Sequence, residues 1–101
     1  MDVSVGDGPS DIRLAGEVDL SSVAQLEEAL AAAAVTREPV TIDLAGVTFI
    51  DSTGLHAIVR FALSSNGQGP VVLRNPPPMA VRLLEIVGVS SMPEIEMRHD
   101  A

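Results

Sequence analysis

Two apolar runs are separated by a short polar cluster of Asp51, Ser52, Thr53 and Gly54, within the stretch VTFIDSTGLHAIVRFA at positions 47–62. The cluster stands where an alternating strand pattern gives way to a helical one. There the Asp51 carboxylate can accept hydrogen bonds from free amides of the first helical turn, so the plainest interpretation is a helix N-cap. A cap does not explain Gly54, because glycine costs about 1 kcal/mol relative to alanine inside a helix. We expect some group to approach the backbone closely at Gly54.

Ser52 is the residue of this cluster that could carry a covalent modification. A phosphate on a hydroxyl in the first turn of a helix faces unpaired amides and the positive end of the helix dipole. It could therefore be attached and removed without unfolding the helix. A dianionic phosphate about 4 Å from a carboxylate of a partner repels it by several kcal/mol at an effective dielectric of about 20, enough to release a bound protein. Ser52 is thus a predicted site of reversible phosphorylation.

Two enzymatic interpretations compete with this one. In a serine hydrolase Ser52 would be the nucleophile and His56, on the same helical face, its base, but the stretch lacks the Gly-x-Ser-x-Gly elbow. In an aspartic protease FIDSTG would supply the catalytic carboxylate. There Thr53 stands between Ser52 and Gly54, and a following helix is incompatible with the tight turn that a carboxylate dyad needs. We expect no enzymatic activity.

The charge and the aromatic content limit the kind of partner. The 101 residues include 14 acidic and 6 basic side chains, which gives a formal net charge of −8. No basic cluster is present to neutralise a phosphate backbone, and Phe49 and Phe61 are the only aromatic residues that could stack on bases. A nucleic acid is therefore not an expected partner, and a protein with a basic or mixed surface is.

Neither a membrane anchor nor a metal centre is expected. The longest apolar run, residues 29–35, is far shorter than the roughly 20 residues of a spanning helix, and no basic and apolar leader opens the chain. The sequence has no cysteine, and the acidic pairs Glu17 with Asp19 and Glu94 with Glu96 lack the further ligands that a metal needs. We expect a cytoplasmic protein without a cofactor.

The elements that must position the cluster follow from hydrophobic periodicity. Strands are expected where apolar residues alternate, the first two as a hairpin: 3–5, 12–14, 40–44, 71–73 and 95–97. Helices are expected where apolar residues recur every three or four positions: 20–35, 52–64 and 79–87. Because strands and helices alternate from residue 40 onward, the prediction is a single α/β domain over residues 1–101. It would have a mixed sheet of four to five strands with three or more helices packed on it.

Four local details complete this prediction. Ser22 and Gln25 have the spacing of a capping box at the start of the first helix. Ser65, Asn66 and Gly67 are expected to end the second helix, and Gly88 is expected to end the third. That helix is expected to bury an apolar stripe of Met79, Ala80, Leu83, Leu84 and Val87.

FIDSTGLHAIV resembles the signature of the STAS domain, as found in bacterial anti-sigma-factor antagonists: an apolar pair, then Asp, Ser, Ser or Thr, Gly and Leu. Two further stretches are similar to the same family. LAGEVD at 14–19 resembles its early Gly-Glu-Leu-Asp turn, and VVLRNPPPMAVRLLEIVGV resembles its strand, proline turn and helix that ends in Gly-Val or Gly-Leu. The resemblance covers nearly the whole chain and implies a STAS-like fold.

The resemblance also implies a partner switch. In this family the first hydroxyl after the aspartate, here Ser52, is phosphorylated by an anti-sigma factor that is itself an ATP-dependent serine kinase. The unmodified form binds that kinase and frees the sigma factor, the phosphorylated form is released, and a serine phosphatase restores it. The resemblance implies that the partner-binding surface contains Ser52 together with Asp19, Asp51, Thr53 and Gly54. We expect His56, one turn after Ser52, to border this surface and pair with the phosphate.

A second interpretation is a short STAS subunit that docks on the ATPase of a lipid-transport system without being phosphorylated. Two departures from the antagonists leave it open: His56 stands where they often have glycine, and the sequence stops near Ala101, before a further helix that many members carry. Such subunits tend to have threonine at the position of Ser52, so the antagonist ranks first.

Overall fold

The structure is a computed structural model that describes residues 1–6, 8, 10–64 and 69–99. The strands are β1 (Asp2–Val5), β2 (Asp11–Val18), β3 (Thr41–Ile50), β4 (Val71–Arg74) and β5 (Ile95–Arg98). The helices are α1 (Val23–Ala34), α2 (Ser52–Ser64) and α3 (Pro78–Ile86), with short 3-10 turns η1 (Leu20–Ser22) and η2 (Val89–Ser91). The α/β class is confirmed, and α2 has the bounds predicted for it.

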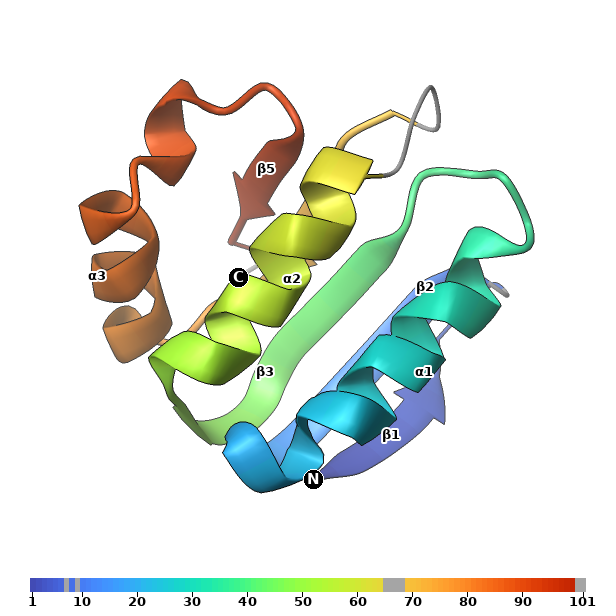
Figure 1. Ribbon diagram of the computed structural model, residues 1–101, viewed down its shortest axis with the longest axis horizontal. Helices are drawn as coiled ribbons and strands as arrows, with labels where there is room; N and C mark the ends of the chain where they lie inside the picture. The colour runs from blue at the N-terminus through green and yellow to red at the C-terminus, as the bar shows by residue number, and fades with distance from the viewer. Residues whose placement is uncertain (7, 9, 65–68, 100–101) are drawn as a thin grey trace.

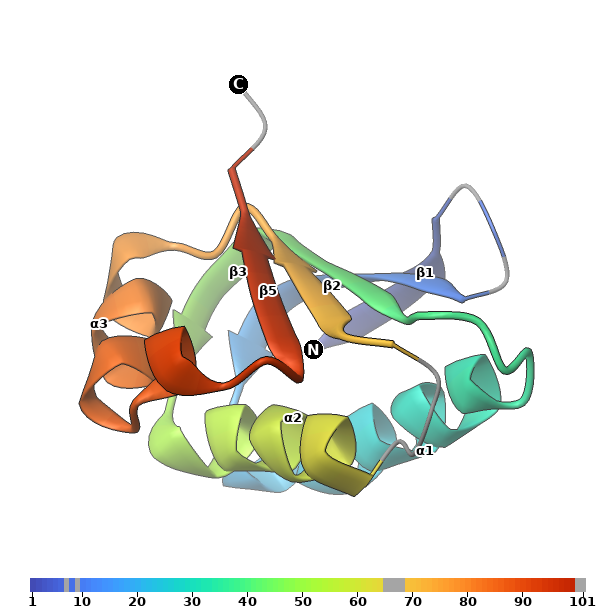
Figure 2. The same cartoon turned by 90° about the horizontal axis from the view of Figure 1, so that it is seen from above.

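The five strands form one mixed sheet in the order β1-β2-β3-β4-β5. The first two pair antiparallel, as the predicted hairpin requires, and the remaining neighbours pair in parallel. The helices α1 and α2 lie side by side across one face of this sheet, and α3 lies beside the beginning of α2 (Figure 1). Figure 2 shows the sheet and the α1–α2 layer edge-on.

The core lies between the sheet and this helical layer. Alternation along each strand directs one set of apolar side chains toward the helices, and the helices bury the faces that their periodicity predicts. Fully buried examples are Ile42 on β3, Leu26 and Leu30 on α1, Ile58 on α2 and Leu84 on α3. Their burial fixes the helices on the sheet and thereby fixes the turns that lead into them.

The first helix begins differently from the prediction. The chain turns through η1 before α1 starts, and the predicted capping box between Ser22 and Gln25 is wrong because Ser22 caps nothing downstream. Its hydroxyl accepts from the Asp19 amide over 2.9 Å and donates to the Asp19 carbonyl over 3.1 Å. Asp19 and Ser22 form the capping box of η1 instead.

The central strand is longer than predicted. We expected it to end near Leu44, but β3 is 10 residues long and continues to Ile50. It keeps pairing with β2 through two register irregularities, between Arg13 and Ala15 and between Gly16 and Glu17. These irregularities break the alternation in the sequence without ending the strand, because the hydrogen bonds to β2 continue to hold it.

The third helix buries less than predicted. Ala80 and Leu84 are buried and Leu83 is partly so, but Met79 and Val87 are exposed, so their assignment to the buried stripe is wrong. The helix has 9 residues, and one narrow face of so short an element meets the core. Gly88 adopts a left-handed conformation with φ of 83°, which ends the helix as expected. The end signal predicted for α2 at residues 65–67 lies outside the described residues.

Candidate functional site

Two aspartates stand at the same edge of the sheet, each directly after a parallel strand. Val18 and Ile50 are register partners at the ends of β2 and β3, so the residues that follow them, Asp19 and Asp51, leave the sheet side by side. The Asp51 amide donates to the Val18 carbonyl over 3.1 Å, which ties the two strand ends together. The topology therefore brings together two stretches that are far apart in the sequence.

Asp51 caps α2, as predicted. Its Oδ1 accepts from the Thr53 hydroxyl over 2.5 Å and from the Gly54 amide over 3.0 Å, and its carbonyl accepts the Leu55 amide over 3.1 Å. The Thr53 hydroxyl, followed by the Gly54 amide, holds the pKa of the Asp51 carboxyl below its ordinary value. A carboxylate with these donors is ionised at neutral pH and fixed in orientation.

Asp19 is held in a similar way by the turn that follows it. Its Oδ1 accepts from the Ser21 hydroxyl over 2.6 Å and from the Ser21 amide over 3.1 Å. The residue between them, Leu20, exposes its side chain almost completely. Leu20 was not predicted to belong to the site, because it lies in a turn that no hydrophobic periodicity marks. Two oriented carboxylates and one apolar side chain therefore surround the beginning of α2.

Ser52 is the first residue of α2 and is exposed. Within the described residues its hydroxyl has no hydrogen-bond partner, whereas the hydroxyl of Thr53 is engaged with Asp51. The cluster thus offers one free hydroxyl and one occupied hydroxyl at the positive end of the helix dipole. A group attached to Ser52 would extend into solvent.

Gly54 is buried, and the close approach predicted for it is confirmed. A Cβ at this position would lie 2.7 Å from Cγ1 of Val18 and 3.1 Å from the Val18 carbonyl oxygen. The group that approaches is therefore the end of β2, within the same chain. Gly54 lets α2 begin directly against the sheet, which sets where Ser52 stands. Its part in binding a partner stays a prediction.

A groove of about 370 Å³ runs between α2 and α3 beside Ser52. Its lining is mostly apolar, with Leu55 and Val59 of α2 on one side and Leu83, Ile86 and Val87 at α3 on the other. Ser52, Thr53 and His56 of α2 add polar groups. His56 thus borders the same surface as Ser52, and its Nδ1 lies 3.5 Å from Nη2 of Arg60. The sequence analysis missed the α3 wall. The signal was present in LLEIV, because apolar residues at four of five consecutive positions cannot all face one side of a helix.

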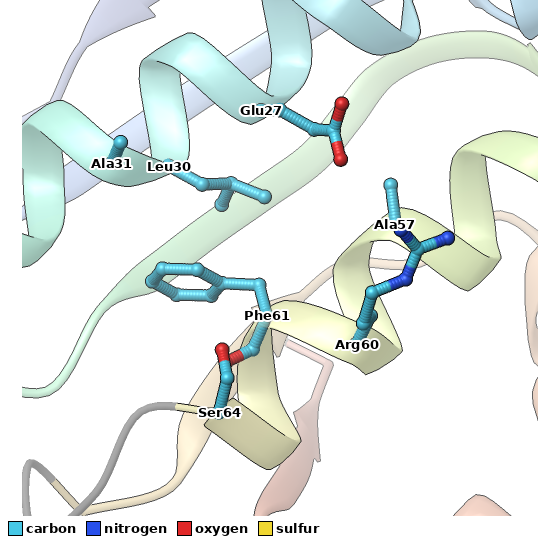
Figure 3. Close-up of a pocket in the computed structure, with 7 residues that line it drawn as sticks. All are labelled: Glu27, Leu30, Ala31, Ala57, Arg60, Phe61 and Ser64. Atoms are coloured by element: carbon cyan, nitrogen blue, oxygen red, sulfur yellow. The ribbon is translucent and has the colours of Figure 1, made fainter.

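A second cleft, of about 310 Å³, lies between α1 and α2 (Figure 3). Leu30 and Phe61 line it, and the charged side chains of Glu27 and Arg60 project at one of its mouths. None of its lining residues belongs to the predicted site, so it is separate from the surface around Ser52.

Among the residues described, no three acidic or histidine side chains are grouped so that they could hold a metal ion. In the same part of the chain, no helix has the length and apolar character needed to cross a membrane.

Comparison with known proteins identifies related sequences. The model of a family described as "Mlab, STAS domain" matches residues 1–95. An anti-sigma-B factor antagonist of Bacillus subtilis is 29% identical over 101 residues, which cover 99% of this chain and 93% of the relative. An anti-sigma-B factor antagonist of Listeria monocytogenes is 38% identical over 88 residues, which cover 85% of this chain and 77% of the relative.

Solved structures share the fold. The unphosphorylated form of the anti-sigma factor antagonist SpoIIAA superposes with a TM-score of 0.68 at 21% identity, over 99% of this chain and 87% of SpoIIAA. The phosphorylated form of the Bacillus cell fate determinant SpoIIAA superposes with a TM-score of 0.69 at 20% identity, over 95% and 88% of the two chains. This fold is therefore compatible with both states of SpoIIAA.

Proposed function

The chain belongs to the STAS domain family, and on that premise we propose that it is an anti-sigma factor antagonist controlled by phosphorylation of Ser52. In its unmodified form it binds an anti-sigma factor that is a serine kinase, and the sigma factor is released. Phosphorylation of Ser52 by that kinase ends the binding, and a serine phosphatase restores it. The surface that binds comprises Ser52 with the residues around it: Asp19, Asp51, Thr53, Gly54 and His56.

One observation carries the proposal: Ser52 has an exposed hydroxyl with no partner among the residues that the structure describes, at the first position of a helix whose cap is already supplied by Asp51. A kinase can reach this hydroxyl without displacing an intramolecular hydrogen bond. The neighbouring Thr53 offers no such access, because its hydroxyl donates to Asp51. The positive end of the α2 dipole favours the phosphate once it is attached.

The relatives support the same assignment. The curated proteins that match over most of this chain are anti-sigma-B factor antagonists, which makes an anti-sigma factor the expected partner. SpoIIAA has been solved with and without its phosphate, so a protein of this fold carries the modification as a folded molecule. Both points favour a regulator that works by binding.

The test begins with the Ser52→Ala variant as bait, because it cannot be released by phosphorylation. We expect it to retain a serine-kinase anti-sigma factor, and we expect Ser52→Asp to lose it. The purified kinase and ATP should then add the mass of one phosphate to the wild-type chain and to Thr53→Ala, the matched hydroxyl control, but not to Ser52→Ala. Retention of the same kinase by Ser52→Asp would contradict the proposal.

The second candidate is a subunit that docks on a transporter ATPase without modification. The apolar groove beside Ser52 is the observation that favours this second candidate, because such a surface can bind a protein without a phosphate on Ser52. The two functions differ in what the bait retains. A transporter ATPase bound equally by Ser52→Ala and Ser52→Asp would establish this candidate in place of the antagonist.

A further inference from the structure

The α3 wall of the groove exposes more apolar surface than the folded chain needs. Ile86 is 74% exposed and Val87 is 53% exposed, although both line a groove whose opposite wall contains the buried side chains of Leu55 and Val59. Adjacent exposed aliphatic side chains beside an apolar groove are typical of a surface that another molecule covers. The position of Ser52 on the same groove links this surface to the proposed switch.

The charge beside the groove gives it a direction. Ser52 and His56, four residues apart on α2, form a short polar stripe in its lining, and Ser52 directly follows Asp51, whose carboxylate caps the helix. Arg60, the next residue at this interval, lines the cleft between α1 and α2 instead. An occupant that complements the groove has an apolar stripe and a basic residue at the end near Asp51.

We propose that the α2–α3 groove receives an amphipathic helix of the anti-sigma factor, an inference that rests on the proposed function. Apolar side chains from successive turns of that helix enter between Leu83, Ile86 and the α2 wall, and its polar flank faces the Ser52 stripe. The volume of about 370 Å³ admits aliphatic side chains, while its few polar groups lie along one side, as in helix-binding grooves.

The charge of the chain argues against the other occupants. A second copy would bring together two molecules that each carry a net charge of −8. An anionic membrane would meet the same charge, and no lysine or arginine is among the described residues that line the groove. A protein helix with a basic end is complementary to this surface.

The groove also explains how more negative charge can release a partner that carries a basic residue. Ser52 stands on the rim, so a helix seated in the groove covers its hydroxyl and excludes water from it. A phosphate there would have to lose hydration in a groove whose described lining has His56 as its one basic side chain, and we expect this cost to exceed the attraction to one basic residue of the partner. The switch therefore acts through desolvation at the edge of an apolar contact.

Two matched variants test the groove. The probe is the purified kinase that binds Ser52→Ala and does not bind Ser52→Asp. Ile86→Asp places a charge at the end of α3 in the groove. Val35→Asp places the same charge at the C-terminal end of α1, where the side chain is 80% exposed and outside the groove. We expect Ile86→Asp to weaken binding about tenfold or more and Val35→Asp to change it less than about twofold.

The readouts separate the possible failures. Matching thermal unfolding curves for the two variants exclude misfolding. If Ile86→Asp bound the kinase with wild-type affinity while Ser52→Asp did not bind it, the proposed groove contact would be wrong and the proposed function would stand. Wild-type affinity of Ser52→Asp would overturn the proposed function itself. A dimer in sedimentation that Ile86→Asp dissociates would show that a second copy is the occupant.

The desolvation mechanism has its own readout. The loss of affinity caused by phosphorylation should persist at about 1 M salt, where charges separated by more than about 3 Å are screened. Recovery of wild-type affinity by the phosphorylated chain at that salt concentration would overturn it.

Discussion

The hydroxyl of Thr53 donates a 2.5 Å hydrogen bond to the carboxylate of Asp51, and this pair forms the cap of α2. Thr53 and Asp51 hold the beginning of the helix, and within the described part of the chain the Ser52 hydroxyl makes no hydrogen bond. Two hydroxyl residues that are adjacent in the sequence therefore differ in structural role. Five predictions concern these residues and Gly54.

Removal of the Thr53 hydroxyl should weaken the helix start. Thr53→Val keeps the shape of the side chain but deletes its hydrogen bond to Asp51, and we expect the free energy of unfolding to fall by about 0.5–1.5 kcal/mol. Urea denaturation measures this change. Ser52→Ala, the neighbouring control, should stay within about 0.5 kcal/mol of wild type. Equal losses for the two variants would contradict the division of roles.

Acid should remove the contribution of the Asp51 charge. The pKa of Asp51 is lowered in the folded chain from its ordinary value of 3.8, mainly by the hydrogen bond from the Thr53 hydroxyl and then by that from the Gly54 amide. The ionised cap therefore stabilises the fold above the unfolded pKa, and this stabilisation is lost as the pH falls through the folded pKa. The stability difference between wild type and Asp51→Asn, measured by urea denaturation, should decrease from pH 7 to below pH 3.8. A difference that does not change with pH would contradict the lowered pKa.

Asp51→Ala should cost about 1 kcal/mol at neutral pH, because no side chain then accepts the Gly54 amide. Asp51→Asn is the control, since asparagine can cap the same helix without a charge. Urea denaturation of the two variants measures the contribution of the cap at a single pH. A stability of Asp51→Ala equal to that of Asp51→Asn would exclude a capping role.

Gly54→Ala should destabilise the protein even though alanine favours a helix. The added Cβ would lie 2.7 Å from Cγ1 of Val18, and overpacking of this kind costs about 1–3 kcal/mol, against a gain of about 1 kcal/mol in helix propensity. In a double-mutant cycle, Val18→Ala should recover part of the loss, because it removes the nearest atom. Strictly additive effects of the two substitutions would mean that the contact does not limit the position.

Ser52→Asp should change binding without changing the fold. A negative charge at the first position of α2 is favoured by the helix dipole and disfavoured by the nearby Asp51, so we expect its stability to stay within about 0.5 kcal/mol of wild type. Thermal unfolding measures the stability, and an NMR spectrum of the backbone amides shows whether the fold is unchanged. A collapse of stability would show that any loss of binding by this variant comes from unfolding.

Local patterns predicted the site well where neighbouring residues determine the structure. The bounds of α2 and its Asp51 cap could be predicted because both depend on hydrogen bonds within a few residues. The full length of β3 could not, since its last residues are held by pairing with β2 across two irregularities. The exposure of Val87 could not either, because the depth at which α3 meets the sheet depends on packing between distant segments.

The side-by-side departure of Asp19 and Asp51 from the sheet was implied only by resemblance to a family. Its physical cause is the parallel pairing of β2 with β3, which aligns Val18 with Ile50. Periodicity finds strands but does not tell which strands are neighbours. LLEIV indicates an apolar surface at the end of α3, but the groove itself could not be predicted, because a groove between two helices exists only once both are placed.

The contact between Gly54 and Val18 limits how a phosphate can be sensed. The first turn of α2 packs directly against the end of β2 at Val18, so we expect a modification of Ser52 to leave the backbone of this turn in place. Distant parts of the molecule would then look the same in both chemical states. Under the proposed function, the phosphate on Ser52 would therefore be detected by the protein that contacts this surface and not through a conformational change within the chain.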